Sequence, residues 1–182
     1  MTALPGPDSA TDAALIEAYR AGSEPAASEL VSRHAPAVGR FLYSAGAAAS
    51  DVEDLAQEAF FRAFRRLDTW RGDASFRSWL FSIARNLLKD EFRKRRGRHV
   101  LSIEDRDVPY RDDPAGEVEA QEAADQLRRG LMDLPRLQRE VFLLRVQEGG
   151  SYDEIAAVLD TTPGAARVHY HHAVKRLKEL LS

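Results

Sequence analysis

The 182-residue sequence contains no cysteine. This absence excludes disulfide bonds and thiolate metal sites, and it is compatible with an intracellular protein. No apolar run approaches the roughly 20 residues that a membrane-spanning helix needs. Residues 1–12 also lack the basic start and the apolar segment of a secretory signal peptide. We therefore expect a cytoplasmic protein without a membrane-inserted segment.

Signals for β-strands are nearly absent as well, because no segment alternates apolar and polar residues with β-branched enrichment. Helical periodicity covers most of the chain and predicts an all-α protein. Capping boxes at 50–53 and 151–154 mark two helix starts, and Pro36 is expected to kink a helix or to begin a new one. The helices are expected over residues 12–21, 25–44, 50–67, 76–96, from 118 onward, 135–148, 151–159 and 163–181.

The segment 99–117 lacks this periodicity. Pro109, Pro114 and Gly116 interrupt it, and most of its charged residues are acidic. Such a composition is typical of a linker between domains. A chain of this length suits two small domains. We therefore expect one helical domain over 10–98, a flexible acidic linker over 99–117 and a second helical domain over 118–182.

The net charge of −3 conceals segments of opposite sign. Residues 1–61 carry a net charge of −6, residues 62–98 carry +8, residues 99–125 carry −7 and residues 126–182 carry +2. A basic segment between acidic segments indicates a site for a polyanion. A solvated basic helix would produce the same charge pattern.

The last two predicted helices have the pattern of a helix-turn-helix. A short capped helix is followed by a tight turn and a longer basic helix, which in such motifs lies in the DNA major groove. Its expected inward face is Ala166, Tyr170, Ala173, Leu177 and Leu180. Its expected outward positions are Arg167, Val168, His171, His172 and Lys175, with Arg176 nearby. An ordinary helical hairpin would give a similar pattern.

The histidines of this helix raise the question of a metal site. His169 and His172 are three residues apart and could share one ligand face. No third ligand is evident, and the neighbouring basic residues oppose a cation. We therefore expect DNA contact or simple solvation at these histidines, and neither a metal nor a cofactor.

The helix expected over 50–67 has two distinct faces. Val52, Leu55, Ala59 and Ala63 define its inward face. The outward face carries Asp54, Gln57, Glu58, Phe61 and Arg65. An apolar anchor with an acidic rim is typical of a protein-docking face, although scattered surface aromatics are also normal.

The helix expected over 76–96 carries a basic stripe. Its inward residues are Phe76, Leu80, Ile83 and Leu87. The stripe opposite them consists of Arg85, Lys89, Arg93 and Arg96, with Asn86 at its edge. Such a stripe can bind phosphates, or in part complement the C-terminal end of the helix. The aromatic residues Trp70, Phe76, Trp79 and Phe81 offer surfaces on which unpaired bases could stack, although Phe76 and Trp79 also fit the core.

Two blocks of sequence carry a specific resemblance. DVEDLAQEAFFRAFR at 51–65 and FRSWLFSIARN at 76–86 resemble region 2 of the extracytoplasmic-function sigma factors of bacterial RNA polymerase. LPRLQREVFLLR at 134–145 and SYDEIAAVL at 151–159 resemble region 4 of the same family. The resemblance covers roughly residues 12–98 and 118 to the end. It implies a non-catalytic transcription initiation factor that binds core polymerase and promoter DNA.

The resemblance also implies roles for single residues. Docking on the clamp helices of the polymerase β′ subunit is implied for Asp54, Gln57, Glu58 and Phe61. Recognition of the promoter −10 element, by capture of a flipped base and by contacts to the adjacent backbone, is implied for Trp70, Arg71, Gly72, Asp73, Ser75, Arg85, Asn86, Lys89 and Arg93. Recognition of the −35 element is implied for Arg167, Val168, His171 and His172, while Lys175 and Arg176 are placed to meet phosphates.

Further partners follow from the family. They are the β flap of the polymerase and an anti-sigma factor, which in relatives can hold the sigma factor at the inner membrane face. Many relatives carry a Ser-Arg pair and several arginines where this chain has Val168, His169, His171 and His172. The resemblance therefore predicts the mode of docking on DNA but not the base sequence that is read.

Two other classes of protein explain less of the sequence. A conventional dimeric helix-turn-helix regulator would bind palindromic half-sites on its own. An α-helical enzyme is disfavoured, because no nucleophile–base group, phosphate loop or metal triad appears in the sequence. Neither class explains the docking face, the basic stripe and the acidic linker together.

Overall fold

The computed structural model describes residues 7–99 and 118–181, with side chains over 11–97 and 122–180. The described residues form helices and loops without a β-strand. The predicted all-α fold is therefore confirmed, and the predicted linker lies outside the described residues except for His99. The first half contains α1 (Pro7–Arg20), α2 (Glu24–Ala45), α3 (Ala49–Arg65), the short helix η1 (Leu67–Thr69) and α4 (Phe76–His99). The second half contains α5 (Val118–Met132), α6 (Arg136–Val146), α7 (Tyr152–Leu159) and α8 (Pro163–Leu181).

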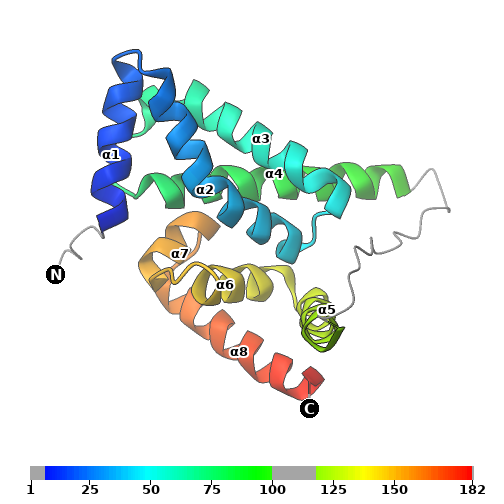
Figure 1. Cartoon of the computed structure of the whole chain (residues 1–182). Helices are drawn as coiled ribbons and strands as arrows, with labels where there is room; N and C mark the ends of the chain where they lie inside the picture. The colour runs from blue at the N-terminus through cyan, green and yellow to red at the C-terminus, as the bar shows by residue number, and fades with distance from the viewer. Residues whose placement is uncertain (1–6, 100–117, 182) are drawn as a thin grey trace.

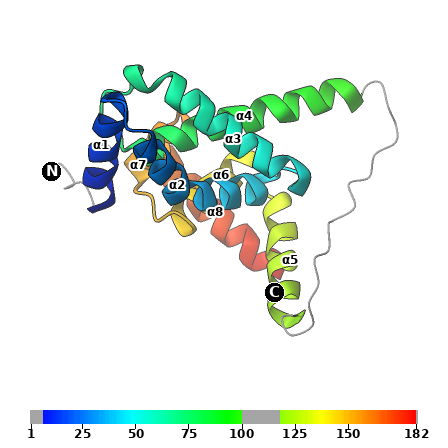
Figure 2. The same ribbon diagram turned by 45° about the horizontal axis from the view of Figure 1, so that its top comes forward.

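The two halves pack against each other, with α1–α4 on one side and α5–α8 on the other (Figure 1). The main contacts across the boundary are α4 with α7 and α2 with α6. The C-terminal end of α4 projects beyond the neighbouring helices in both ribbon views (Figures 1 and 2). The end of the basic stripe therefore lies away from the body of the protein.

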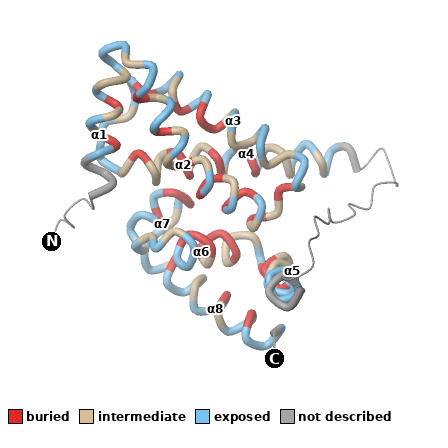
Figure 3. The backbone as a smooth tube through the Cα atoms, viewed as in Figure 1, coloured by how far each residue is buried: buried red, intermediate tan, exposed pale blue. Residues whose placement is uncertain are grey.

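Buried apolar side chains of both halves form one connected core. Phe41 of α2 and Phe81 of α4 meet edge to face, with ring centroids 5.3 Å apart. Leu144 of α6 and Ile155 of α7 extend this core from the other side. Burial is concentrated on the facing sides of the helices (Figure 3). Each such large side chain contributes roughly 1.5–3 kcal/mol of hydrophobic stabilisation when it is fully buried.

The helix starts match the sequence predictions only in part. The capping box of α7 is present: Ser151 Oγ accepts a hydrogen bond from Glu154 N, and Glu154 Oε2 accepts one from Ser151 N. The capping box predicted at 50–53 is wrong. Helix α3 begins at Ala49, and Ser50 Oγ donates to the Asp51 carboxylate instead of capping the helix. Asp51 still places a negative charge in the first turn, where it complements the helix dipole.

Pro36 does not begin a new helix, because α2 continues through it from Glu24 to Ala45. Proline lacks the N–H that would bond to the carbonyl of residue 32. Both Ser32 and Pro36 are exposed, so water can satisfy this carbonyl.

Gly46 ends α2 at the junction of the two halves. Its φ of 115° lies in the left-handed region, where a side chain would be strained. An added Cβ would also lie 3.2 Å from the Phe92 ring of α4 and 3.3 Å from the end of Met132 of α5. The sharp end of α2 thus allows α4 and α5 to approach the same point.

Candidate functional site

The predicted docking face lies on the outer side of α3. This helix contacts α2, α4 and η1 and none of the helices α5–α8 within the described part of the chain. Phe61 is 55% exposed, and the guanidinium of Arg65 lies 5.4 Å from its ring centroid. Glu58 forms an exposed ion pair with Arg62 at 2.6 Å. The structure brings the four predicted docking residues onto one open helix face, namely Asp54, Gln57, Glu58 and Phe61.

The predicted base-capture loop connects η1 to α4. The Trp70 ring stands edge-on to Phe76, and its Nε1 donates to the carbonyl of Ala74 at 3.1 Å. Gly72 has a φ of 78°, which lets the chain turn beneath this ring. Ser75 Oγ accepts a hydrogen bond from Ser78 N and so caps α4. Exposed positions on this loop include Arg71 and Asp73.

Arg20 is a residue of this site that the sequence analysis missed. It ends α1, and its Nη2 donates to the carbonyls of Leu67 and Trp70 at 2.9 and 3.4 Å. The guanidinium therefore ties α1 to both ends of the turn that precedes the loop. No local sequence pattern indicates this role, because the partners are backbone atoms about 50 residues away.

The basic stripe of α4 is divided in the structure. Asn86, Lys89, Arg93 and Arg96 are exposed, as predicted. Arg85 is not, because its side chain is only 15% exposed and its Nε lies 3.1 Å from Glu140 of α6. The prediction that Arg85 lies on an open face is therefore wrong for this arrangement of the two halves. Phe81 is also buried, at 2% exposure, so it cannot offer a free stacking surface.

The helix-turn-helix is formed by α7 and α8. Asp160 takes a left-handed conformation, with φ 53°, and ends α7. Thr162 then caps α8, since its Oγ1 accepts a hydrogen bond from Ala165 N. Ala166, Ala173 and Leu177 are buried as predicted, whereas Leu180 is 42% exposed. The last turn of α8 therefore extends past the core.

The predicted DNA-facing residues of α8 all lie on its open side. These exposed residues are Arg167, Val168, His171, His172, Lys175 and Arg176. Arg167 and Arg145 both lie over the Tyr152 ring, at 5.2 and 4.9 Å from its centroid. Arg145 was not among the predicted site residues, although it belongs to the segment 134–145 that resembles region 4. Arg145 of α6 therefore adds a second positive charge next to Arg167 of α8.

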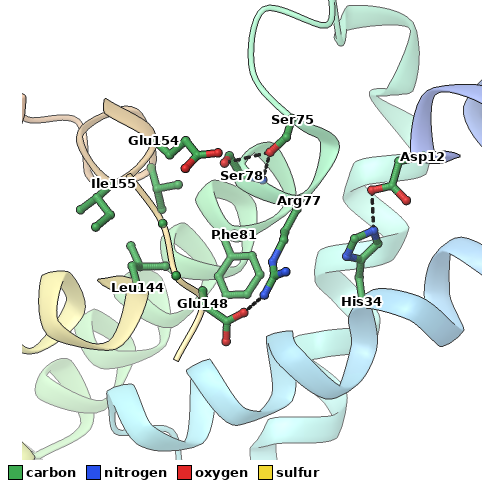
Figure 4. A pocket seen from close by; sticks show the side chains of 13 residues that line it. Asp12, His34, Ser75, Arg77, Ser78, Phe81, Leu144, Glu148, Glu154 and Ile155 are labelled. Atoms are coloured by element: carbon green, nitrogen blue, oxygen red, sulfur yellow. Dashed lines mark hydrogen bonds and ion pairs between the residues drawn. The ribbon is translucent and has the colours of Figure 1, made fainter. Parts of the chain in front are cut away.

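The boundary between the halves contains a cavity of about 210 Å³. Arg77 and Phe81 of α4 line it from one half, and Glu148, just after α6, lines it from the other (Figure 4). His34 Nε2 lies 2.7 Å from a carboxylate oxygen of Asp12, and both side chains are almost fully buried. Arg77 and Glu148 form an ion pair across the cavity.

Among the residues that the structure describes, no three His, Asp or Glu side chains are grouped so as to hold a metal ion. None of the described helices combines the length and apolar character needed to cross a membrane.

Comparison with protein families gives two matches. Residues 30–98 match the model of sigma-70 region 2, and residues 124–177 match that of sigma-70 region 4. The chain is 35% identical over 173 residues to the RNA polymerase sigma factor CarQ of Myxococcus xanthus, covering 91% of this chain and 95% of CarQ. It is 33% identical over 176 residues to the ECF RNA polymerase sigma-E factor of Escherichia coli (strain K12), covering 86% and 87% of the two chains.

Solved structures agree with these matches. CnrH, in a complex with the cytosolic domain of CnrY, aligns with a TM-score of 0.74 at 29% identity and covers 94% of this chain and 97% of its own. The sigma factor RpoE from Bartonella quintana, in complex with the anti-sigma factor NepR, aligns with a TM-score of 0.68 at 25% identity, covering 85% and 95%. The chain therefore belongs to the extracytoplasmic-function sigma factors, which direct bacterial RNA polymerase to promoters.

Proposed function

We propose that the chain binds core RNA polymerase through α3 and reads the −10 and −35 promoter elements with its two separate halves. The observation that carries this proposal is the separation of three surfaces of different chemistry. An apolar and acidic face lies on α3, an aromatic loop leads into a basic helix, and a basic recognition helix lies on α8.

The α3 face fits a protein partner. Phe61 provides an exposed apolar anchor, and the acidic residues around it attract a basic surface. The proposed partner is the clamp-helix region of the polymerase β′ subunit. The β flap is the proposed contact of the second half.

The −10 element is proposed to bind at the loop 70–75 and along α4. The Trp70 ring is proposed to offer a stacking surface for an unpaired base and Asn86 to line its pocket, while Lys89 and Arg93 hold the backbone phosphates. The exposure of these three polar side chains supports this assignment. Arg71, Gly72, Asp73 and Ser75 are proposed to shape the loop around the base.

The −35 element is proposed to meet α8 in the major groove. Arg167, His171 and His172 lie where a recognition helix reaches base edges, and Val168 offers an apolar contact. Lys175 and Arg176 lie further along the helix and are proposed to bind phosphates. A conventional dimeric regulator is not favoured, because it leaves the α3 face and the region 2 match without a role.

An anti-sigma factor is the proposed regulatory partner. The structural relative RpoE was solved in complex with the anti-sigma factor NepR, and CnrH was solved in complex with the cytosolic domain of CnrY. A membrane-bound partner would place this chain at the inner membrane face. We propose that the chain itself performs no covalent chemistry and needs no cofactor.

Run-off transcription with purified core polymerase tests the proposal. Core enzyme with this chain should start transcripts from a defined subset of genomic promoters, and core enzyme alone should not. A parallel gel shift with the chain alone should show weak promoter binding. Tight binding of the chain alone to palindromic sites, without promoter-specific transcripts, would instead support the dimeric regulator.

A further inference from the structure

Glu140 of α6 is a buried acid that sits between two arginines. Its side chain is 1% exposed. One carboxylate oxygen lies 3.1 Å from Arg85 Nε of α4, and the other lies 2.7 Å from Arg136 Nε of its own helix. A buried carboxylate is tolerated only when it is paired in this way. The pairing therefore depends on the contact between the two halves.

A second carboxylate of the other half, Glu148, pairs with an arginine near the beginning of α4 through one of its oxygens, while its other oxygen is buried without a hydrogen-bond partner. Its side chain is 5% exposed and pairs with Arg77, two residues after the loop 70–75 (Figure 4). Both arginines belong to α4, and both acids belong to α6 and the turn that follows it. Two of the cations on the helix proposed to bind the −10 element are thus occupied by carboxylates of the other half.

These carboxylates bind the guanidinium groups of the two arginines by the same kind of interaction that a DNA phosphate would make. Guanidinium groups bind carboxylate and phosphate with similar charge-assisted hydrogen bonds. An arginine that is held by a buried carboxylate cannot bind a phosphate at the same time. The side of α4 around Arg85 is also covered physically, because α7 packs on α4.

We propose that the second half is an internal competitor of promoter DNA, with Glu140 and Glu148 holding Arg85 and Arg77 in place of backbone phosphates. In this closed arrangement α8 and the α3 face stay open, while the middle of α4 is blocked. Engagement of the −10 element requires α6 and α7 to separate from α4. The inference rests on the proposed function, since it concerns regulation of the same DNA site.

The energetics allow such a separation. An ion pair that is buried at an interface adds little net stability, because its formation must offset the desolvation of both charges. On opening, Glu140 and Arg85 regain water, so the cost of losing their pair is small. Other polar contacts across the boundary are similarly replaceable by water, such as Gln147 with Ser44 at 3.2 Å. The free energy cost of opening comes instead from the shared apolar core, to which Leu144 and Ile155 contribute from the second half. The ion pairs are therefore the part of the closed arrangement that a polyanion can displace directly.

The double variant Glu140→Gln/Glu148→Gln tests this competition. The matched control is Glu24→Gln/Glu122→Gln, which makes the same charge change at exposed positions of α2 and α5. Binding of a random-sequence single-stranded DNA library by the full chain should tighten by roughly tenfold relative to the control, because charge-assisted bonds no longer occupy the arginines. Adding Arg85→Ala to the double variant should remove most of this gain.

Opening can be measured independently of DNA. Because the chain has no native cysteine, Ser50→Cys and Asp133→Cys provide two exposed labelling positions, one in each half. Energy transfer between dyes at these positions should fall in the double variant and stay unchanged in the control. If the double variant does not fold by circular dichroism, the single variant Glu148→Gln should show smaller changes in the same direction.

The proposed competition is wrong if the folded double variant and the control show the same energy transfer and the same DNA affinity. Failure of the proposed function is distinguishable, because it is measured by run-off transcription with the unmodified chain. Promoter-specific transcripts together with an unchanged double variant would reject only the internal competition. If no such transcripts appear but energy transfer falls as predicted, the promoter assignment is wrong. The role of Glu140 and Glu148 in holding the two halves together would then still stand.

Discussion

The two proposed DNA-binding helices differ in how the closed arrangement presents them. On α8, the six predicted residues are exposed and the inner side packs on its own half. On α4, Asn86, Lys89 and Arg93 are exposed, but Arg85 is held by Glu140 of the other half. The proposed −35 surface is therefore open before any rearrangement, whereas the proposed −10 surface would be completed only after the halves separate.

The largest effect is expected on the open face of α3. Asp54→Ala combined with Phe61→Ala should weaken binding to core polymerase by roughly 30-fold, since truncation of an anchor residue costs about 2 kcal/mol or more. The matched control is Asp125→Ala with Leu127→Ala on α5, which removes the same kinds of groups from another exposed surface. A pull-down titration with core enzyme measures both. An equal affinity of the two variants would remove α3 from the docking site.

The same variant shows whether polymerase docking depends on separation of the two halves. If docking does not wait for opening, the loss caused by Asp54→Ala/Phe61→Ala should be the same when Glu140→Gln/Glu148→Gln is present. If the loss of polymerase affinity differs between the backgrounds with and without Glu140→Gln/Glu148→Gln, polymerase docking and separation of the halves are coupled.

The second prediction concerns the loop and α4. Trp70→Ala and Asn86→Ala should impair promoter opening more than initial duplex binding, because stacking of one base on an aromatic ring contributes about 1–3 kcal/mol. Permanganate reactivity of unpaired thymines reports opening, and a filter-binding assay at low temperature reports the initial complex. Trp70→Phe is the control, because it keeps an aromatic ring but loses the bond to Ala74. Normal permanganate reactivity in both alanine variants would place base capture elsewhere.

The fold was predictable from the sequence because its helices carry their own signals. Ser151 and Glu154 form the expected capping box, and the apolar spacing of α8 correctly predicts the burial of Ala166, Ala173 and Leu177, whereas Tyr170 is half-buried. Ser50 does not cap α3, because the same residue pattern can occur one position inside a helix. Local capping patterns indicate a helix start but do not fix the residue at which it begins.

The divided α4 stripe was not predictable from a helical wheel. A wheel places Arg85 with Lys89 and Arg93, and within the helix this is correct. Its exposure depends on Glu140, which lies 55 residues away in the other half. Phe81 is similar, because its burial requires Phe41 and the second half of the chain. Contacts between segments that are distant in the sequence therefore decide which positions of α4 stay exposed.

The third prediction tests whether α8 reads bases without help from α4. Arg167→Ala and His171→Ala should change which −35 sequences are selected, with a loss of about 1–3 kcal/mol at the contacted base pair. A −35 library selection with core polymerase present measures these preferences. The same preferences should appear in the Glu140→Gln/Glu148→Gln background, since α8 is already open. Identical selections by wild type and His171→Ala would leave His171 as a solvated residue.

The smallest effect is expected from Lys175 and Arg176, which lie on the same exposed side of α8 but nearer its end. Phosphate contacts carry no base information, so Lys175→Ala and Arg176→Ala should weaken all −35 sequences alike. Each lost contact should lower the slope of log affinity against log salt by about one unit, because fewer counterions are released. Affinity titrations of holoenzyme on two unrelated promoters, over a range of salt concentrations, measure both quantities. A loss restricted to one promoter would instead assign base recognition to this part of α8, and the division between base-reading and phosphate-binding residues would have to move toward its C-terminal end.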